Sequence, residues 1–371
     1  MPVFVSIQRR GLIAAVIAGA ALAAAVPASA HVIPLQELRQ GVAMTPTQCA
    51  SLPSTVWLVV QGRPFCIRYY LSNAGGQGAQ QGTQLAARPV VFLEGDKLGS
   101  FNTRTGVFKV EPGKDRDINT DNLDRYAEGL SKRNKTTAIY LGRVGVDGSS
   151  GDHRLRHTLL ELQVTNAALD AIKQRHRFEG FHLVGQSGGS TLAGGLLAMR
   201  ADVGCAVLGA GRLVNPPNLW PKGPTGQIIE QFNVVDAAAI IAQRRTTRIL
   251  LVTDPADQRV PEKFQTPFVQ MVRQAGGQAD QFLVQATDEN RHGVTPYAHM
   301  TMAACVQGAS SPEIAQQLTQ LVAKRLADKA KADLQKATQQ ASAAPSAPSV
   351  PQPAQSTTAV ITGPPRSGVT R

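Results

Sequence analysis

Short, almost wholly apolar runs alternate along this chain with longer segments in which apolar residues recur at helical spacing. The clearest runs are 89–93, 137–141, 203–208 and 248–252. Runs of this kind are typical of strands buried on both faces of a sheet. The segment 119–132 instead places Leu123, Ala127 and Leu130 on one face of a helix. The alternation predicts an α/β fold in which helices cover both sides of a mostly parallel sheet.

Further strands are expected at both ends of this pattern. The segments 55–61 and 65–71 are β-rich and joined by a Gly-Arg-Pro turn, and 281–285 is the last predicted strand. A strand also precedes the glycine-rich stretch that begins at 185. Ligand chemistry in parallel sheets gathers at the carboxyl ends of the strands, so the loops that follow these runs are the first place to look for a site.

The sequence predicts one α/β domain over 31–340. Between 211 and 232 the chain is rich in proline and predicts a short excursion over the carboxyl edge of the sheet. A final helix is expected to begin at Ser311, with Pro312 at its first turn. From 341 to 371 Ala, Pro, Ser, Gln and Thr dominate, a composition that predicts a disordered tail.

The N-terminus has the features of a secretory signal peptide. Arg9 and Arg10 precede an apolar run at 11–26, and Ala-Ser-Ala at 28–30 is a small-residue cleavage site. The run is shorter than the roughly 20 residues that span a bilayer. We therefore expect residues 1–30 to be removed after Ala30 and the mature protein to be periplasmic or secreted.

Export changes the meaning of the four cysteines. In an oxidising compartment an even number of cysteines favours disulfides over metal ligation. Cys49 and Cys66 flank the predicted hairpin and are expected to pair, which leaves Cys205 and Cys305 as a long-range pair. No metal site is predicted, and zinc is disfavoured because the sequence has no Cys-x-x-Cys motif.

The formal net charge of +12 suggests attraction to an anionic envelope surface or to acidic polymers. A basic surface that is merely solvated is the plainer interpretation of the same charge. Nothing in the sequence resembles a nucleic-acid-binding module, so a nucleic-acid partner is not expected.

The stretch 182–190 contains the motif Gly-x-Ser-x-Gly, directly after a short apolar run and before the helix-prone segment 191–200. Gly185 and Gly189 allow the backbone to close where a Cβ would collide, and the turn then exposes the hydroxyl of Ser187. The positive end of the following helix points at charge that develops there. The pattern predicts a nucleophilic serine.

A serine needs a base to remove its proton and a carboxylate to orient that base. In folds of this type the three groups follow the order Ser, acid, His. After Ser187 only His292 and His299 are available, and His292 is favoured because it lies in a loop just past the last strand. Asp257 and Asp254 both follow the strand at 248–252; Asp257, which lies farther into the loop, is favoured as the acid.

A developing oxyanion needs two preorganised N–H donors. The first candidate is the N–H of Gly188, and the second is a backbone N–H of Gly95 or Asp96 in the loop after the first apolar run. Asp152 and His153 could suggest a further catalytic pair. Because they precede the serine and follow a different strand, we interpret them as residues that brace their loop.

The Gly-Gln-Ser-Gly-Gly elbow at 185–189, the Asp-x-x-Val-Pro loop at 257–261 and the His-Gly pair at 292–293 resemble the α/β-hydrolase superfamily. The resemblance is strongest to its prolyl-oligopeptidase-like and dienelactone-hydrolase-like branches and covers about 56–325. It implies an eight-stranded, mostly parallel sheet and the triad Ser187, Asp257 and His292. It implies no cofactor and no metal.

These features together predict an exported serine hydrolase that cleaves short-acyl carboxylic esters through an acyl-enzyme on Ser187. The excursion at 211–232 is too short for a lid over long acyl chains, but Trp220 can supply one wall for a small substrate group. Two alternatives stay open. One is a prolyl-oligopeptidase-like peptidase or amidase acting on a peptide substrate, and the other is a non-catalytic envelope-binding protein with the same fold.

Overall fold

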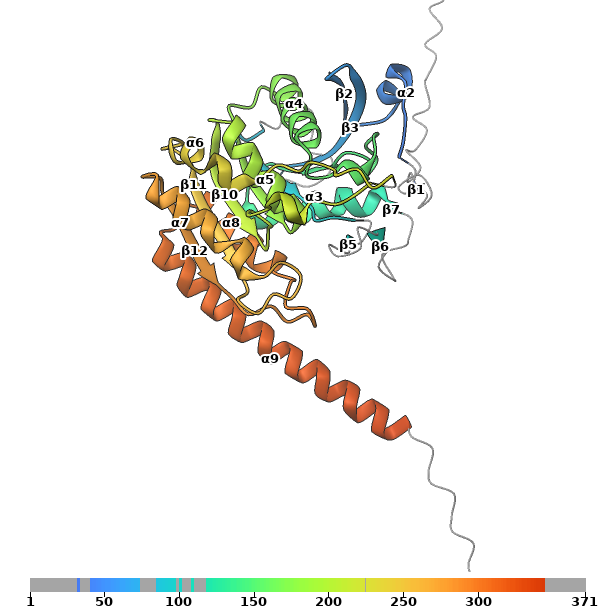
Figure 1. Cartoon of the computed structure of the whole chain (residues 1–371). Helices are drawn as coiled ribbons and strands as arrows, with labels where there is room; N and C mark the ends of the chain where they lie inside the picture. The colour runs from blue at the N-terminus through green and yellow to red at the C-terminus, as the bar shows by residue number, and fades with distance from the viewer. Residues whose placement is uncertain are drawn as a thin grey trace, which may run out of the picture.

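The computed structural model describes residues 32–33, 41–73, 85–97, 100–101, 108–109, 118–223 and 225–343 (Figure 1). The predicted signal peptide at 1–30, its cleavage site and most of the predicted tail at 341–371 lie outside the described residues.

Within the described residues the main sheet has eight strands. They are β2 (Thr55–Val60), β3 (Arg63–Ser72), β4 (Val90–Leu93), β8 (Ala138–Leu141), β9 (Phe181–Gln186), β10 (Val203–Gly209), β11 (Arg248–Thr253) and β12 (Ala279–Leu283). Their spatial order is β12-β11-β10-β9-β4-β8-β3-β2. The strand β3 is antiparallel to both of its neighbours, and the pairs from β8 through β12 are parallel. The predicted mostly parallel sheet of the α/β-hydrolase fold is confirmed.

Small two-stranded pairs accompany this sheet. They join β1 (Val32–Ile33) to β7 (Ile118–Asn119) and β5 (Ser100–Phe101) to β6 (Phe108–Lys109).

Helices connect the strands and cover the sheet. They are α2 (Pro46–Ser51), α3 (Thr120–Asn134), α4 (Leu159–His176), α5 (Gly188–Met199), α6 (Ala238–Ala242), α7 (Thr266–Gln274), α8 (Thr295–Val306) and α9 (Ser311–Ala343). Short 3-10 turns are η1 (His153–Leu155), η2 (Pro217–Leu219), η3 (Val234–Ala237) and η4 (Glu262–Phe264).

Two hydrophobic cores lie on the two faces of the sheet, because alternate residues of each strand point to opposite faces. Along β4, Val91 and Leu93 contribute to the core under α4, α5, α6 and α7. Val90 and Phe92 contribute to the core under α3, α8 and the start of α9. Burial on both faces explains why this strand is apolar at every position.

The helix α9 begins at Ser311 as predicted and docks through its first turns. Ile314 and Leu318 are buried against the sheet, whereas the later turns are largely exposed, with Leu334 70% exposed. Figure 1 shows the C-terminal part of α9 extending beyond the body of the molecule. The helix continues to Ala343, three residues past the expected end of the domain at 340.

Both expected disulfides are present. Cys49 on α2 is bonded to Cys66 on β3, and Cys205 on β10 is bonded to Cys305 on α8. The second bond closes a separation of 100 residues and fastens α8 to the centre of the sheet. Within the described parts of the chain, no helix combines the length and apolar character needed to cross a bilayer.

Candidate active site

The serine of the Gly-x-Ser-x-Gly motif lies at the turn between β9 and α5. Ser187 has φ 53° and ψ −121°, a backbone conformation that is strained for a residue with a side chain. Its N–H donates to the carbonyl of Gly209 at 2.8 Å, which ties the turn to β10. The strand-to-helix turn therefore holds the hydroxyl at the carboxyl edge of the sheet.

The glycines on either side of this serine have no room for a side chain. A Cβ on Gly185 would lie 2.5 Å from the carbonyl oxygen of Gly189. A Cβ on Gly189 would lie 2.0 Å from the carbonyl oxygen of Leu93 on β4. Both obstacles are backbone atoms of the elbow and its neighbouring strand, so the motif requires glycine at these positions for steric reasons.

The loop after β4 passes beside the serine. A Cβ on Gly95 would lie 3.2 Å from the Ser187 Cβ and 3.8 Å from its Oγ. Gly188 is the first residue of α5, where backbone N–H groups have no acceptor within the helix. The structure thus brings together Gly188, Gly95 and Asp96, the segments predicted to donate to an oxyanion; the choice between the last two remains a prediction.

The favoured acid and base are in contact. His292 Nδ1 lies 2.7 Å from Asp257 Oδ2. An ionised carboxylate only accepts hydrogen bonds, so Nδ1 donates and Nε2 is left as the basic nitrogen. The Asp257 side chain is fully buried, and its Oδ1 accepts from the backbone N–H groups of Arg259 at 2.8 Å and Val260 at 2.9 Å. These bonds fix the orientation of the carboxylate.

The loop that carries His292 is bonded to the elbow. The Gln186 side chain donates to the His292 carbonyl at 2.9 Å, and Asp288 accepts from the backbone of His292 at 3.1 Å and of Gly293 at 2.7 Å. Burial raises the pKa of Asp288, but these hydrogen bonds outweigh it and lower the pKa. Among the described residues no hydrogen bond joins Ser187 Oγ to the imidazole; such bonds often tighten only with substrate.

His299, the alternative base, is a buried structural residue. Its Nε2 lies 2.7 Å from the Tyr126 hydroxyl. Burial lowers the pKa of His299 to about 3, and the charge of Arg133 acts in the same direction. The imidazole on α8 is therefore neutral at physiological pH and packs under the sheet.

Asp254, the alternative acid, binds an arginine instead of an imidazole. Its fully buried carboxylate accepts from Arg291 Nε at 2.7 Å and Nη2 at 3.0 Å. It also accepts from the backbone N–H of Ala286 at 2.7 Å. Since Arg291 immediately precedes His292, this pair fastens the base loop to the end of β11.

A buried charged network lies beside the elbow, and sequence reasoning missed it. Arg143 binds both oxygens of Glu161, at 2.9 and 3.1 Å, and donates to Asp96 Oδ1 at 2.9 Å. The other Asp96 oxygen accepts from Arg156 at 3.0 Å and lies 3.1 Å from His157 Nε2. Burial raises the pKa of Asp96, but the interactions with His157, Arg156 and Arg143 outweigh it and hold the pKa well below its ordinary range.

This network touches the predicted oxyanion site. A Cβ on Gly188 would lie 2.1 Å from Asp96 Oδ1, so the carboxylate covers the Cα of the residue after Ser187. The sequence predicted a role for Asp96 through its backbone alone. The side chain could not be anticipated, because its partners come from the loop after β8 and the start of α4, far away in the sequence.

Next to this network, Glu94 is bound through one of its two oxygens. Its Oε2 accepts from Lys97 Nζ and from the Tyr140 hydroxyl, each at 2.5 Å. The Tyr140 hydroxyl also lies 3.0 Å from Asp147 Oδ2. Burial first, and then the two carboxylates, raise the pKa of Tyr140 well above its ordinary value, so this tyrosine stays a neutral donor.

The pair Asp152 and His153 braces its loop, as interpreted from the sequence. Asp152 caps η1 by accepting from the backbone N–H of Arg154 at 2.9 Å. His153 is fully buried, with Nδ1 3.1 Å from the Val144 carbonyl. Burial holds the pKa of His153 well below its ordinary value.

The proline-rich excursion bonds to the charged network. Gln231 donates to the Arg156 carbonyl at 3.2 Å, and the Phe232 N–H donates to the His157 carbonyl at 2.9 Å. Trp220 is half-buried, and its indole N–H donates to the carbonyl of a neighbouring excursion residue at 3.0 Å. No hydrogen bond or ring contact within the described chain links Trp220 to the triad, so its role as a substrate wall stays a prediction.

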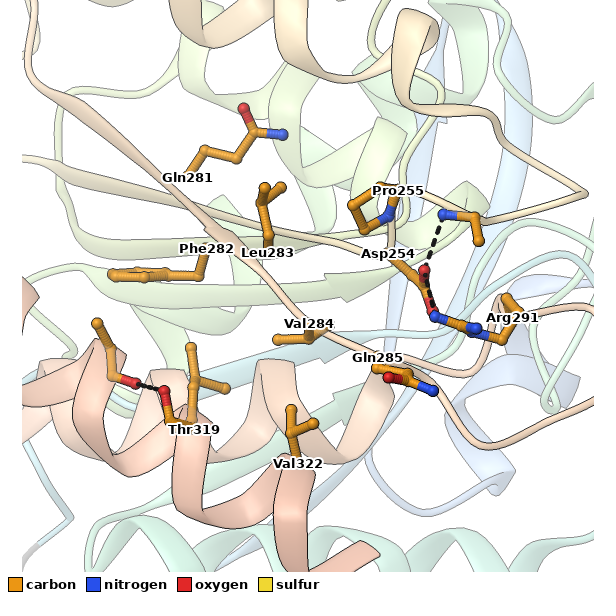
Figure 2. A pocket seen from close by; sticks show the side chains of 13 residues that line it. Asp254, Pro255, Gln281, Phe282, Leu283, Val284, Gln285, Arg291, Thr319 and Val322 are labelled. Atoms are coloured by element: carbon orange, nitrogen blue, oxygen red, sulfur yellow. Dashed lines mark hydrogen bonds and ion pairs between the residues drawn. The ribbon is translucent and has the colours of Figure 1, made fainter. Parts of the chain in front are cut away.

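A pocket of about 560 Å³ lies behind the acid and base loops, between β12 and α9 (Figure 2). Phe282, Val284, Leu318 and Val322 form its apolar wall. The pair of Asp254 and Arg291 lies at one end, and neither Ser187 nor His292 lines it. Among the described residues no group of three or more His, Cys, Asp or Glu side chains is arranged to hold a metal ion.

The sequence matches no family model and no curated protein. Solved structures with a similar fold include an acylaminoacyl peptidase from Pyrococcus horikoshii, at 14% identity and a TM-score of 0.44. The match covers 66% of this chain and 38% of that one. An esterase from Pyrococcus furiosus matches at 11% identity and a TM-score of 0.47, over 73% of this chain and 98% of that one.

A puromycin-hydrolyzing peptidase from Mycobacterium tuberculosis matches at 15% identity and a TM-score of 0.46, over 72% of this chain and 42% of that one. This chain therefore spans well under half the length of either peptidase. Likenesses this distant do not assign an activity, and the fold rests on the strand order described above.

Proposed function

We propose that this chain, which has the α/β-hydrolase fold, is a serine hydrolase whose nucleophile, acid and base are Ser187, Asp257 and His292. The observation that carries the proposal is the geometry of the carboxyl edge. A strained turn presents the serine, and a buried carboxylate orients an imidazole whose loop is bonded to that same turn.

In this mechanism His292 Nε2 accepts the proton of Ser187 as the hydroxyl oxygen attacks the substrate carbonyl. Asp257 stabilises the imidazolium that forms. The N–H of Gly188, with one donor from Gly95 or Asp96, stabilises the negative charge on the tetrahedral intermediate. Collapse expels the alcohol with the proton from His292, and water activated by the same imidazole then hydrolyses the acyl-enzyme.

We propose short-acyl esters as the substrate class, ahead of peptides and amides. An aminopeptidase needs a free carboxylate to bind the substrate amine. Near the serine, Asp96 already binds Arg143, Arg156 and His157, and Glu94 already binds Lys97 and Tyr140. The short excursion also leaves little cover for a long acyl chain, which supports a small ester with Trp220 as one wall.

Export to the periplasm or beyond, and association of the basic protein with an anionic envelope surface, complete the proposal. The signal-peptide features of the sequence support the first. The formal net charge of +12 supports the second.

A fluorophosphonate probe and a p-nitrophenyl ester series test the proposal directly. The wild type is expected to be labelled and to hydrolyse the butyrate ester far better than the palmitate. Ser187→Ala is expected to lose labelling and about 10⁶-fold in kcat, and Asp257→Asn about 10⁴-fold. Ser190→Ala, on the same turn, is the matched control and keeps its labelling. An unlabelled wild type would favour the non-catalytic alternative, and amides turned over better than any ester would favour the peptidase.

A further inference from the structure

The loop after β10 carries a cation without a counter-charge. Arg212 is only partly exposed, and within the described part of the chain its guanidinium has no hydrogen bond and no ion pair. Its side chain stacks on Phe264, with Cζ 5.5 Å from the ring centroid. Burial lowers the pKa of Arg212, and the charge of Asp96 offsets this only in part. Guanidinium donors without acceptors are costly in a partly desolvated position.

The backbone places this arginine beside the nucleophile. Gly209, three residues earlier, accepts the hydrogen bond from the Ser187 N–H at 2.8 Å. The carbonyl of Arg212 accepts from the Thr191 hydroxyl, on the first turn of α5, at 3.2 Å. Phe264 follows the acid loop and accepts from the next two backbone N–H groups of the arginine loop. The backbone of the arginine loop therefore lies between the elbow and Phe264, and the guanidinium lies over the Phe264 ring.

The neighbouring charges do not neutralise Arg212. Asp96 and Glu161 are two carboxylates, and they are bound by the two guanidinium groups of Arg143 and Arg156. Each of these carboxylates is thus bound by another cation and not by Arg212. The positive end of α5 adds to the positive field of Arg212.

We propose that Arg212 binds a carboxylate of the substrate, so that the preferred substrates are small esters that carry a carboxylate in addition to the scissile bond. This inference rests on the serine-hydrolase function proposed above. A guanidinium presents a planar pair of donors that matches a carboxylate. The cation–π contact with Phe264 restricts the position of the guanidinium before substrate arrives.

Two matched ester pairs test this inference on the intact mature protein. Mono-p-nitrophenyl glutarate against p-nitrophenyl pentanoate places the carboxylate on the acyl side, and 4-acetoxybenzoate against phenyl acetate places it on the alcohol side. We expect kcat/KM of the wild type to favour the carboxylate in at least one pair. Arg212→Gln is expected to lower that ratio about ten- to hundredfold. Arg212→Lys restores only part of it, because the charge remains without the planar fork.

Arg273→Gln, which removes an exposed guanidinium paired with Asp280, is the matched control and keeps the ratio of the wild type. Neutral esters preferred in both pairs, or an unchanged ratio in Arg212→Gln, would overturn the inference. If that variant does not fold, inhibition of the wild type decides: glutarate must bind at least about tenfold tighter than glutaramide. A protein that is labelled at Ser187 without any carboxylate preference refutes this inference alone, whereas absent labelling refutes the hydrolase function itself.

Discussion

Replacing Arg143 by methionine tests whether the buried charges beside the elbow hold the site together. Its side chain is 1% exposed and that of Glu161 is 0% exposed. The variant loses both bonds to Glu161, one to Asp96 and one to the carbonyl of Glu94. Glu161 then keeps only the backbone N–H of His157, at 2.6 Å. A buried charge left without its partner costs about 3–5 kcal/mol, and the free energy of unfolding is expected to fall by that amount.

Removing both charges is expected to cost less than the two single variants suggest. In Arg143→Met/Glu161→Leu no unpaired charge remains between the loop after β8 and α4. The loss of unfolding free energy in the double variant should therefore fall short of the sum of the single losses by about 2–3 kcal/mol. Urea unfolding at pH 7, followed by circular dichroism, gives all three differences. A loss below about 1 kcal/mol in Arg143→Met, or additive single losses, would refute the role assigned to the pair.

The kinetic part of the same experiment separates positioning from stability. Arg143 also fixes the Asp96 loop, so kcat on a short ester is expected to fall in both the single and the double variant. Arg200→Met is the matched control. Its side chain is 4% exposed and binds Asp170 and Asp202, which are 59% and 20% exposed and remain partly hydrated once unpaired. That variant is expected to lose less stability and to keep kcat.

Three further changes address other parts of the fold. The pKa of His299 is about 3 in the folded protein and about 6.5 when unfolded, so the unfolded state binds more protons and stability falls as pH drops below 6.5. At pH 4.5 the loss of unfolding free energy is about 2.7 kcal/mol. The urea midpoint of His299→Gln should therefore fall less steeply between pH 6.5 and pH 4.5 than that of the wild type. An equal pH dependence in the two proteins would contradict this reasoning. Replacing Cys205 and Cys305 together by alanine is expected to lower the free energy of unfolding by about 4–5 kcal/mol in the loop-entropy model. Urea unfolding of the variant and of the oxidised wild type measures this difference. Equal stabilities would show that the bond contributes nothing. Arg291→Met frees the base loop from Asp254 and is expected to lower kcat about ten- to a hundredfold with little change in KM. In steady-state assays Arg291→Lys should recover part of this loss of kcat. An unaltered kcat in Arg291→Met would mean that other contacts hold the loop.

Much of the geometry around the proposed triad could be predicted because each candidate residue is recognisable from local chemistry. Ser187 is marked by Gly185 and Gly189, because nearby backbone atoms leave no room for a Cβ at either position. Asp257 and His292 are marked by their position after strands that end at the same edge of a parallel sheet. In such a sheet the order of the chain largely determines which loops meet, so spacing along the sequence carries spatial information.

The charged network could not be predicted for the opposite reason. The network consists of charged residues in a loop and at the start of a helix, namely Arg143, Arg156 and Glu161. Charged residues are seldom fully buried unless paired, so the sequence alone predicts that they are exposed to solvent. Whether such residues are buried depends on the charged partners that the fold brings to them. The periodicity of apolar residues along the sequence does not indicate these partners. The same limit applies to Arg212, because no sequence pattern shows that its guanidinium has no hydrogen-bond acceptor among the described residues.

The two kinds of residue nevertheless depend on one another. The strained backbone of Ser187 persists only because its surroundings determine it, and those surroundings are the carbonyls of Leu93 and Gly209 on the flanking strands. The loop after Leu93 is in turn fixed by Asp96, whose carboxylate is neutralised by Arg143 and Arg156. Ionic bonds among residues far apart in sequence thus hold the loop that packs against the elbow, and we expect the conformation of Ser187 to depend on them.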